Sequence, residues 1–485
     1  MFGSSDCKDR LKDYINNQDM KKIISFSFVF FVLTIPFHHA IAGNGLQKSY
    51  AGWKAGVASM IITPTESIWL AGYGGRTHPS EGTLNDLWIK ALALQDAKGT
   101  RSVLVTMDLE ELPKSLSDRV RDQLNRKFHL SKAQVILNVS HTHSSPVLAG
   151  YGDIYPLDSD QVIKIKKYTD QLAENIISLV GKALHSMEQV KLYSGNGITR
   201  FQVNRRNNSE SLLKSETELK GPNDYSVPVI KVVNSSGKIM AIAFGYACHN
   251  TVLSGYQWSG DYAGFAQSEL EKLYPGATAL FFQGCGGDQN PLPRRSPALA
   301  KQYGQTLAAA VESVIQEDMK ELSPQLSTSY KEIKLPLSAP PTKKELLEME
   351  KRFSGYQKRW VTRQLDQLNK GKSLMTSYPY PLQILRLGDQ TMMMLGGEAV
   401  IEYAIQLKQM FGQDIFVLGY SNDVMAYIPS SAIINEGGYE GASSVTTTDL
   451  PSTWASDIEI TILSQMVQLA KESGINKIEF GLTKK

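Results

Sequence analysis

The sequence predicts an α/β fold in which mixed β-sheets are flanked by helices within a single large domain. At least six short, nearly unbroken apolar runs occur along the chain, and each ends in a cluster of polar residues. Such runs, bounded by turn residues, are typical of strands covered on both faces. Longer stretches at 343–370 and 457–474 are expected to form helices. No internal repeat or long low-complexity linker divides the chain.

The amino terminus has the pattern of an export signal preceded by extra residues. A basic start at 20–22 is followed by an apolar core at 23–36, too short for a comfortable membrane span, and by a small-x-small cleavage site at 40–42. We expect Met20 to be the true start, which leaves Cys7 outside the mature protein.

Cleavage after Ala42 would leave 443 residues, exported to the periplasm or secreted. An uncleaved membrane anchor is the alternative, but Pro36, His38 and His39 fit poorly inside a bilayer. Processing removes five Lys/Arg and four Asp/Glu, so the formal net charge falls from +3 to +2. Neither this balance nor any basic run with interleaved aromatics indicates nucleic acid. No protein partner is inferred, and peripheral contact with a membrane surface stays open.

The predicted strands end in side chains that can do chemistry. These ends are 108–110 after the run 102–107, His141 and His143 after 133–139, 248–250 after 239–247, 285–290 after 277–284, Glu398 after 391–397, and Asp423 after 415–420. In folds with buried strands, ligands bind outside the carboxyl ends of the strands, where these clusters would meet. The sequence therefore predicts an active site at this edge.

Among these strand ends, His141 and His143 give the most specific indication of chemistry. Successive side chains of a strand alternate faces, so the two rings would project to the same side if the strand continued through them. They would then be close enough to serve one metal ion or one reacting group. Two polar residues at the end of a strand are the alternative.

The clearest interruption of this pattern is the segment 331–377. A Pro-rich turn at 339–341 precedes a highly charged helix predicted at about 343–370, in which Leu346, Met349, Phe353, Trp360 and Leu365 recur periodically. We interpret this stripe as core packing and the segment at about 340–375 as a helical excursion inside one domain.

Cys248 and Cys285 remain after processing, and each lies beside a candidate site cluster. A single disulfide and two buried free thiols are equally consistent with the sequence. Metal ligation by thiolate ranks lowest, because neither cysteine has the CxxC spacing of a thiolate site.

Taken together, the motifs resemble the neutral and alkaline (non-lysosomal) ceramidase family, zinc-dependent amidases that cleave the N-acyl bond of ceramide. The segments 55–64 and 70–74 resemble the start of the family, and the later motifs follow in the same order from about residue 51 to about residue 445. Each motif is short, and the order over nearly the whole mature chain carries the resemblance.

The resemblance implies one zinc ion per chain, held by His141, His249, Glu398 and Tyr427. Imidazole and carboxylate suit zinc, and a catalytic site keeps a position for water. Tyrosine is the unusual member, because its pKa is normally about 10 and coordination as phenolate needs the help of the cation. The residues alone would also allow a core tyrosine at Tyr427 and a salt-bridging surface acid at Glu398.

The resemblance further implies that His143 is an acid/base, that Tyr439 donates its hydroxyl to an oxyanion, and that Arg205 is a polar anchor. Arg206 is the register alternative to Arg205, and solvated surface charge is the alternative for both arginines. Asp288 would orient a histidine or water, or cap a helix or turn.

Two features depart from the family pattern. Asn290 stands where ceramidases carry a serine that is important to catalysis. An asparagine amide can donate hydrogen bonds to an oxyanion but is not a hydroxyl nucleophile, so we expect no acyl-serine step. The chain also stops soon after its last predicted helix, which leaves no room for the immunoglobulin-like domain typical of ceramidases.

We therefore expect an exported zinc-dependent hydrolase that cleaves an N-acyl amide bond of a ceramide-like lipid with metal-activated water. A metallohydrolase acting on a different amide or ester of the cell envelope or of glycans is the first alternative. The second is a catalytically silent lipid- or sugar-binding protein on the same fold.

Overall fold

The computed structural model describes residues 52–150, 154–213, 215 and 218–475. The predicted export signal and Cys7 lie outside these residues. Among the described residues, the helices are all too short or too polar to cross a bilayer.

The larger sheet is mixed and has the strand order β11-β9-β8-β6-β1-β3-β4-β5, with β13 paired to β6. Its strands are β1 (Trp53–Ile61), β3 (Trp88–Gln95), β4 (Arg101–Met107), β5 (Val135–Val139), β6 (Glu188–Ile198), β8 (Ser226–Asn234), β9 (Ile239–Tyr246), β11 (Thr278–Gln283) and β13 (Lys320–Glu321). The pairs β4–β5 and β9–β11 are parallel, which places their carboxyl ends at one edge.

The smaller sheet has the order β14-β15-β16-β18 and packs face to face on the larger one. It consists of β14 (Leu326–Pro336), β15 (Ser377–Leu387), β16 (Gln390–Leu395) and β18 (Phe416–Leu418). Phe282 of β11 and Phe416 of β18 stack across this interface with ring centroids 6.4 Å apart. Burying a large apolar side chain of this kind contributes about 1.5–3 kcal/mol.

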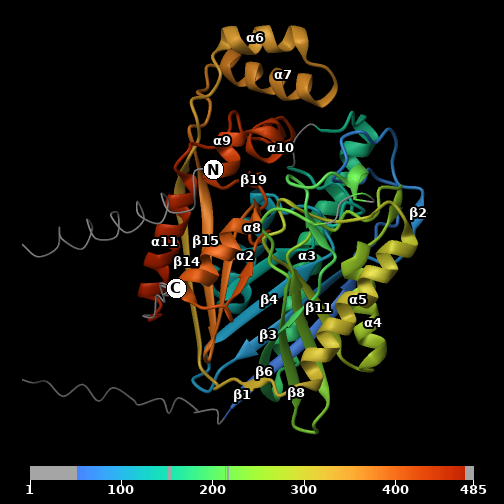
Figure 1. Ribbon diagram of the computed structural model, residues 1–485, viewed down its shortest axis with the longest axis vertical. Coiled ribbons are helices and arrows are strands. Elements are labelled where there is room, and N and C mark those ends of the chain that lie inside the picture. Colours follow the sequence, from blue (N-terminus) through green and yellow to red (C-terminus); the bar gives the residue numbers. More distant parts are fainter. Residues whose placement is uncertain (1–51, 151–153, 214, 216–217, 476–485) are drawn as a thin grey trace, which may run out of the picture.

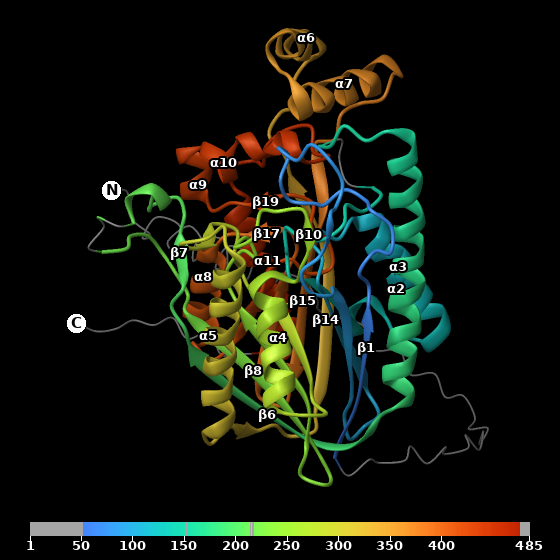
Figure 2. The same cartoon turned by 90° about the vertical axis from the view of Figure 1, so that its right-hand side faces the viewer.

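Helices cover the outer faces of both sheets, so the described elements form four layers (Figures 1 and 2). α2 (Lys114–Phe128), α3 (Ser159–His185), α4 (Asp261–Leu273) and α5 (Pro297–Gln316) cover the larger sheet, and α8 (Ile401–Phe411) and α11 (Ile458–Glu472) cover the smaller one. Neighbouring strand residues face opposite layers: Ala243 packs toward the second sheet, whereas Phe244 packs against α4 and α5. This explains the unbroken apolar runs and confirms the predicted α/β fold with mixed sheets flanked by helices.

Short elements tie the loops together at the carboxyl edge. They are β2 (Gly82–Thr83), β7 (Gln202–Asn204), β10 (Gln257–Trp258), β12 (Gln289–Pro291), β17 (Glu398–Ala399), β19 (Tyr427–Ile428), α9 (Ser431–Glu436), α10 (Gly438–Gly441) and the 3₁₀ turns η3 (Glu210–Leu212) and η4 (Ser443–Thr447). A further 3₁₀ turn, η2 (Lys132–Gln134), lies at the amino end of β5.

The charged segment predicted as one helix at about 343–370 is two helices, α6 (Lys343–Arg352) and α7 (Gly355–Asn369). The backbone is extended at Phe353 and Ser354, and Gly355 adopts a φ of 54°, which reverses the chain. The hairpin buries Leu346 against Trp360 and their neighbours, so its periodic residues are core. In both views it stands at the end of the molecule that also carries β17 and β19 (Figures 1 and 2).

Candidate metal centre

The predicted strand-end clusters meet at the carboxyl edge. His141 follows β5, His249 follows β9, and Glu398 follows β16. An isolated bridge joins Thr142 to Asn250, so the loops after β5 and β9 run side by side. His141, His143 and His249 are buried, and one imidazole nitrogen from each lies within 4.8 Å of the other two, so these three residues could hold a metal ion.

His141 and His143 are close for a different reason from the one predicted. The strand ends at Val139, and His141 has a φ of 60°, so the alternation of a strand does not continue through the pair. The chain turns instead, and the His141 amide donates to the carbonyl of Leu109 at 2.8 Å. The two rings meet edge to face, with their Nε2 atoms 3.1 Å apart.

Backbone carbonyls fix the orientation of two imidazoles. His141 Nδ1 lies 2.7 Å from the carbonyl oxygen of Glu110, and His249 Nδ1 lies 2.6 Å from that of Gly286. Since a carbonyl only accepts, each Nδ1 carries the proton and each Nε2 presents a lone pair. Both Nε2 atoms point at Glu398 Oε2, at 3.1 and 3.2 Å.

Burial alone would raise the pKa of Glu398, but His141 and His249 hold it well below its usual range. Burial, aided by the charge of Arg205, lowers the pKa of His249 to about 4. The carboxylate is therefore ionised and this imidazole neutral near neutral pH. Glu398 Oε2 is buried and receives no hydrogen bond from any described residue. A buried carboxylate oxygen without a hydrogen bond, facing two imidazole nitrogens, is an arrangement that a bound cation stabilises.

Tyr427 completes the group. It lies directly opposite Glu398 in the parallel pair β17–β19, and its hydroxyl is 3.3 Å from His249 Nε2. Burial raises the pKa of Tyr427 well above its usual value, whereas Arg205, which donates to the hydroxyl at 3.0 Å, acts in the opposite direction. Two imidazoles, a carboxylate and a phenol form a donor set that suits a first-row transition metal such as zinc.

Arg205, and not Arg206, contacts this group. Arg205 Nη1 lies 3.3 Å from Asn290 Oδ1, and its Nε donates to Glu440 Oε1 at 2.7 Å. Arg206 instead bridges Glu440 and Glu436. Both guanidinium groups are largely buried and paired, so neither is solvated surface charge.

Tyr439 lies beside the group on α10. Its ring centroid is 5.4 Å from that of Tyr427, and the residue is 47% exposed. Desolvation by the surrounding protein, together with the charge of Glu398, raises the pKa of Tyr439 to about 12 even though the residue is half exposed. The phenol is therefore a hydrogen-bond donor at neutral pH and is open to a ligand.

Asp288 makes the contacts of a helix cap. Its Oδ1 accepts a hydrogen bond from the amide of Ile401, the first residue of α8, at 3.0 Å. Its Oδ2 accepts one from Asn204 Nδ2 at 2.7 Å. The sequence left open whether Asp288 orients a histidine or water or caps a helix or turn, and these contacts are those of a cap.

Three residues around His143 and one acid beside Arg205 were not predicted to belong to the site. Gly72 has a φ of 98°, and a Cβ there would lie 2.3 Å from the His143 ring. Tyr73 packs edge on against this ring with centroids 4.8 Å apart, and Arg76 donates to the His143 carbonyl at 2.7 Å. The segment 70–74 was noted only as a family motif, and nothing in the sequence distinguishes Glu440 from other acids.

Cys248 and Cys285 are both free and buried. Of the two possibilities that the sequence left equal, the structure has the two buried free thiols and not the disulfide. Burial raises the pKa of each thiol, so neither presents a thiolate.

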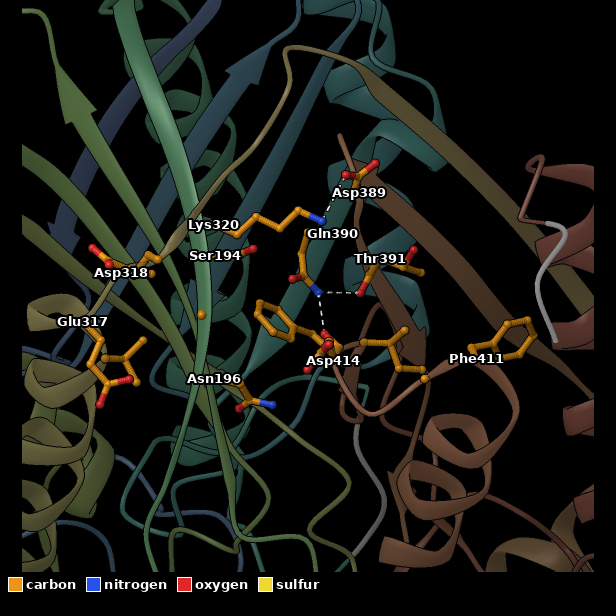
Figure 3. A pocket seen from close by; sticks show the side chains of 16 residues that line it. Ser194, Asn196, Glu317, Asp318, Lys320, Asp389, Gln390, Thr391, Phe411 and Asp414 are labelled. Carbon is orange, nitrogen blue, oxygen red and sulfur yellow. Dashed lines mark hydrogen bonds and ion pairs between the residues drawn. The ribbon is translucent and has the colours of Figure 1, made fainter. Parts of the chain in front are cut away.

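A separate cavity of about 550 Å³ lies at the amino ends of β16 and β18, away from Glu398, which follows the carboxyl end of β16 (Figure 3). Its lining includes an ion pair between Lys320 and Asp389 at 3.0 Å. It also includes a hydrogen bond of 2.9 Å that Gln390 donates to the Asp414 carbonyl. None of the predicted site residues lines it.

Comparison with known proteins agrees with this architecture. The crystal structure of neutral ceramidase from Pseudomonas aeruginosa is similar with a TM-score of 0.68 at 17% identity, over 86% of this chain and 74% of that one. A ceramidase complexed with C2 is similar with a TM-score of 0.68 at 16% identity, over 87% and 76% of the two chains. At these identities the likeness shows the fold. No curated protein matches the chain.

A family model described as neutral/alkaline non-lysosomal ceramidase, N-terminal, matches residues 53–328. The match spans more than half of the sequence and includes His141, His143 and His249. The chain therefore belongs to the neutral/alkaline non-lysosomal ceramidase family.

Proposed function

We propose that this chain is a zinc-dependent amidase that hydrolyses the N-acyl amide bond of a ceramide-like lipid. The observation that carries the proposal is the convergence of His141 Nε2 and His249 Nε2 on Glu398 Oε2, which is buried and has no hydrogen-bond partner among the described residues. Membership of a ceramidase family supports the reaction class.

His141, His249, Glu398 and Tyr427 hold the zinc ion in this proposal. When bound, zinc polarises a carbonyl and lowers the pKa of water toward about 7. Arg205 donates to the Tyr427 hydroxyl and so favours the phenolate form that coordination requires. The Glu110 and Gly286 carbonyls keep the two imidazoles in the ligating tautomer.

His143 moves the proton. Burial and the neighbouring imidazoles hold the pKa of His143 well below its usual value, so the ring is neutral and able to accept a proton. Its Nδ1 is buried and has no hydrogen-bond partner among the described residues. His143 takes a proton from the attacking water and returns it to the leaving amine.

Tyr439 and Asn290 stabilise the oxyanion. The hydroxyl of Tyr439 keeps its proton at neutral pH and can donate it in a hydrogen bond. The carbonyl oxygen of Asn290 accepts from Arg205, which leaves its amide group as the donor. Donors fixed before the reaction contribute most where water is excluded.

Asn290 also supports a second candidate, a metallohydrolase that acts on a different amide or ester of the cell envelope or of glycans. The same residues would carry that reaction, and only the substrate differs. In either case we propose export with cleavage near Ala42, on the strength of the amino-terminal pattern.

The test uses protein spanning residues 43–485, loaded with zinc and given a fluorescent short-chain ceramide beside simple N-acyl amides and esters. We expect ceramide turnover that a chelator abolishes and added zinc restores. Turnover of another amide or ester alone would move the assignment to the second candidate. A zinc-loaded protein that leaves every compound intact would contradict the amidase proposal and favour a binding protein.

A further inference from the structure

Arg295 is an exposed residue with a left-handed backbone conformation. Its φ is 83°, in the left-handed region that side chains rarely adopt, and its amide donates to the carbonyl of Val252 at 2.6 Å. The residue itself is exposed. Such strain persists only where the surrounding structure imposes it, and it concentrates at functional sites.

Arg295 is joined to the metal centre through Tyr73. Its guanidinium carbon lies 5.4 Å from the Tyr73 ring centroid, and its Nη1 donates to the Tyr73 hydroxyl at 3.3 Å. The Tyr73 hydroxyl in turn donates to the Leu253 carbonyl at 2.9 Å, which holds the ring in place. The same ring packs against His143 with centroids 4.8 Å apart. A single aromatic ring thus separates the guanidinium from the proposed proton carrier.

Arg295 also differs in charge balance from the other arginines near the centre. Arg205 and Arg206 share Glu440, and Arg294 pairs with Glu210 at 3.0 Å. Arg76 is buried and donates to backbone carbonyls. Within the described part of the chain, no carboxylate forms an ion pair with Arg295. It is an exposed cation without a protein counter-ion, one ring away from the reacting groups.

The side of the centre on which Arg295 lies indicates which part of a substrate it meets. Tyr73 and Arg295 adjoin His143, which protonates the leaving amine in the proposed function. Arg205 and Tyr439 adjoin Tyr427 instead. With the roles proposed for His143 and Tyr439, a group attached to the amine would lie nearer Arg295, and the carbonyl oxygen nearer Arg205 and Tyr439.

We propose that Arg295 binds an anionic group, a carboxylate or a phosphate, carried by the amine portion of the substrate. The planar guanidinium donates two parallel hydrogen bonds to either anion. Among simple amides that share one acyl chain, those of amino acids or of phosphorylated amines are then preferred over neutral ones. This assignment rests on the proposed amidase function and makes Arg295 a specificity-determining residue.

The experiment compares three amides with the same acyl chain: N-decanoylglycine, N-decanoylphosphoethanolamine and the neutral N-decanoylethanolamine. The variants are Arg295→Gln, which keeps size and removes charge, and Arg295→Lys, which keeps charge. Arg126→Gln on the exposed end of α2 is the matched control. We expect Arg295→Gln to raise KM for the anionic amides about ten-fold, the loss expected for hydrogen bonds to a charged group. The neutral amide and the Arg126 variant should be unaffected, and Arg295→Lys should restore part of the preference.

Equal KM changes for the anionic and neutral amides, or none, would overturn the assignment. The glycine and phosphoethanolamine amides separate a carboxylate from a phosphate as the preferred anion. Equilibrium binding of the same compounds to chelator-treated protein gives a readout that does not need turnover. If neither ceramide nor any of these amides is hydrolysed, the amidase proposal fails. The Arg295 assignment is then decided by binding: a charge-dependent preference lost in Arg295→Gln supports it, and equal binding refutes it.

Discussion

The position of the His143 ring depends on Gly72, because a side chain at that residue would collide with it. The ring rests directly against the Cα of Gly72, Tyr73 packs on its edge, and Arg76 holds its carbonyl. Its Nδ1 has no hydrogen-bond partner among the described residues and its Nε2 lies 3.1 Å from His141 Nε2, so packing on Gly72 and Tyr73 helps to orient the ring. A group positioned by packing is displaced by any added atom at the contact.

Gly72→Ala should therefore reduce turnover strongly and leave metal binding intact. The new Cβ would lie 2.3 Å from the His143 ring at a φ of 98°, so the loop or the ring must move. A displacement of about 1 Å costs on the order of 100-fold in rate. The measurement is kcat together with zinc content. Gly75→Ala is the matched control, because its Cβ meets nothing within 4 Å. Equal activity in both variants would show that His143 is not held in this way.

At the scale of elements, helix α8 connects the segment of Glu398 to the loop that carries Asp288 and Asn290. It begins at Ile401, three residues after Glu398, and its first amide donates to Asp288 from the loop after β11. The negative charge also lies at the positive end of the helix dipole. Asp288 thereby joins the loop that carries Asn290 to the element that follows Glu398.

Asp288→Ala should lower the free energy of unfolding by about 2 kcal/mol, since a helix cap and a second buried hydrogen bond are lost. It should also weaken zinc binding, because the start of α8 no longer fixes the chain around Glu398. Asp158→Ala is the control: it removes the cap of α3, where Asp158 accepts from the Gln161 amide at 2.8 Å, and should cost stability alone. Zinc affinities that fall equally in both variants, or in neither, would contradict this coupling.

The same elements show what the sequence could predict. Buried strands and polar clusters at their ends are local patterns, and they were sufficient for the α/β fold and for the meeting of His141, His249 and Glu398. The break at Gly355 and the left-handed turn at His141 depend on packing and were missed. Asp288 and Ile401 are 113 residues apart, and Arg205 and Glu440 are 235 apart, so no local pattern could reveal these contacts.

At the scale of the whole molecule, the four layers bury carboxyl groups as well as apolar side chains. Burial raises the pKa of Asp108 and Asp261 to about 6 and that of Asp423 to about 7. An acid whose pKa is higher in the folded than in the unfolded protein stabilises the fold while it is protonated. For Asp423 this contribution is complete below about pH 4 and is lost as the pH rises to about 7.

Asp423→Asn should therefore gain stability relative to the unsubstituted protein as the pH rises from 4 to 7. The amide stays neutral throughout this range, and its oxygen can still accept the hydrogen bond that Tyr378 donates to Asp423 Oδ2 at 2.8 Å. Denaturant unfolding at pH 4, 5, 6 and 7 measures the difference. A difference independent of pH would show that Asp423 does not titrate in this range in the folded protein.

The most direct measurement for the whole account is the zinc content of protein spanning residues 43–485, beside that of His141→Ala and His185→Ala. The account predicts about one zinc per chain in the unsubstituted protein and in His185→Ala, whose imidazole contacts the Gly181 carbonyl on α3. His141→Ala should lose both the metal and amide hydrolysis. A His141→Ala protein that keeps its zinc and its activity would contradict the assignment of the metal centre.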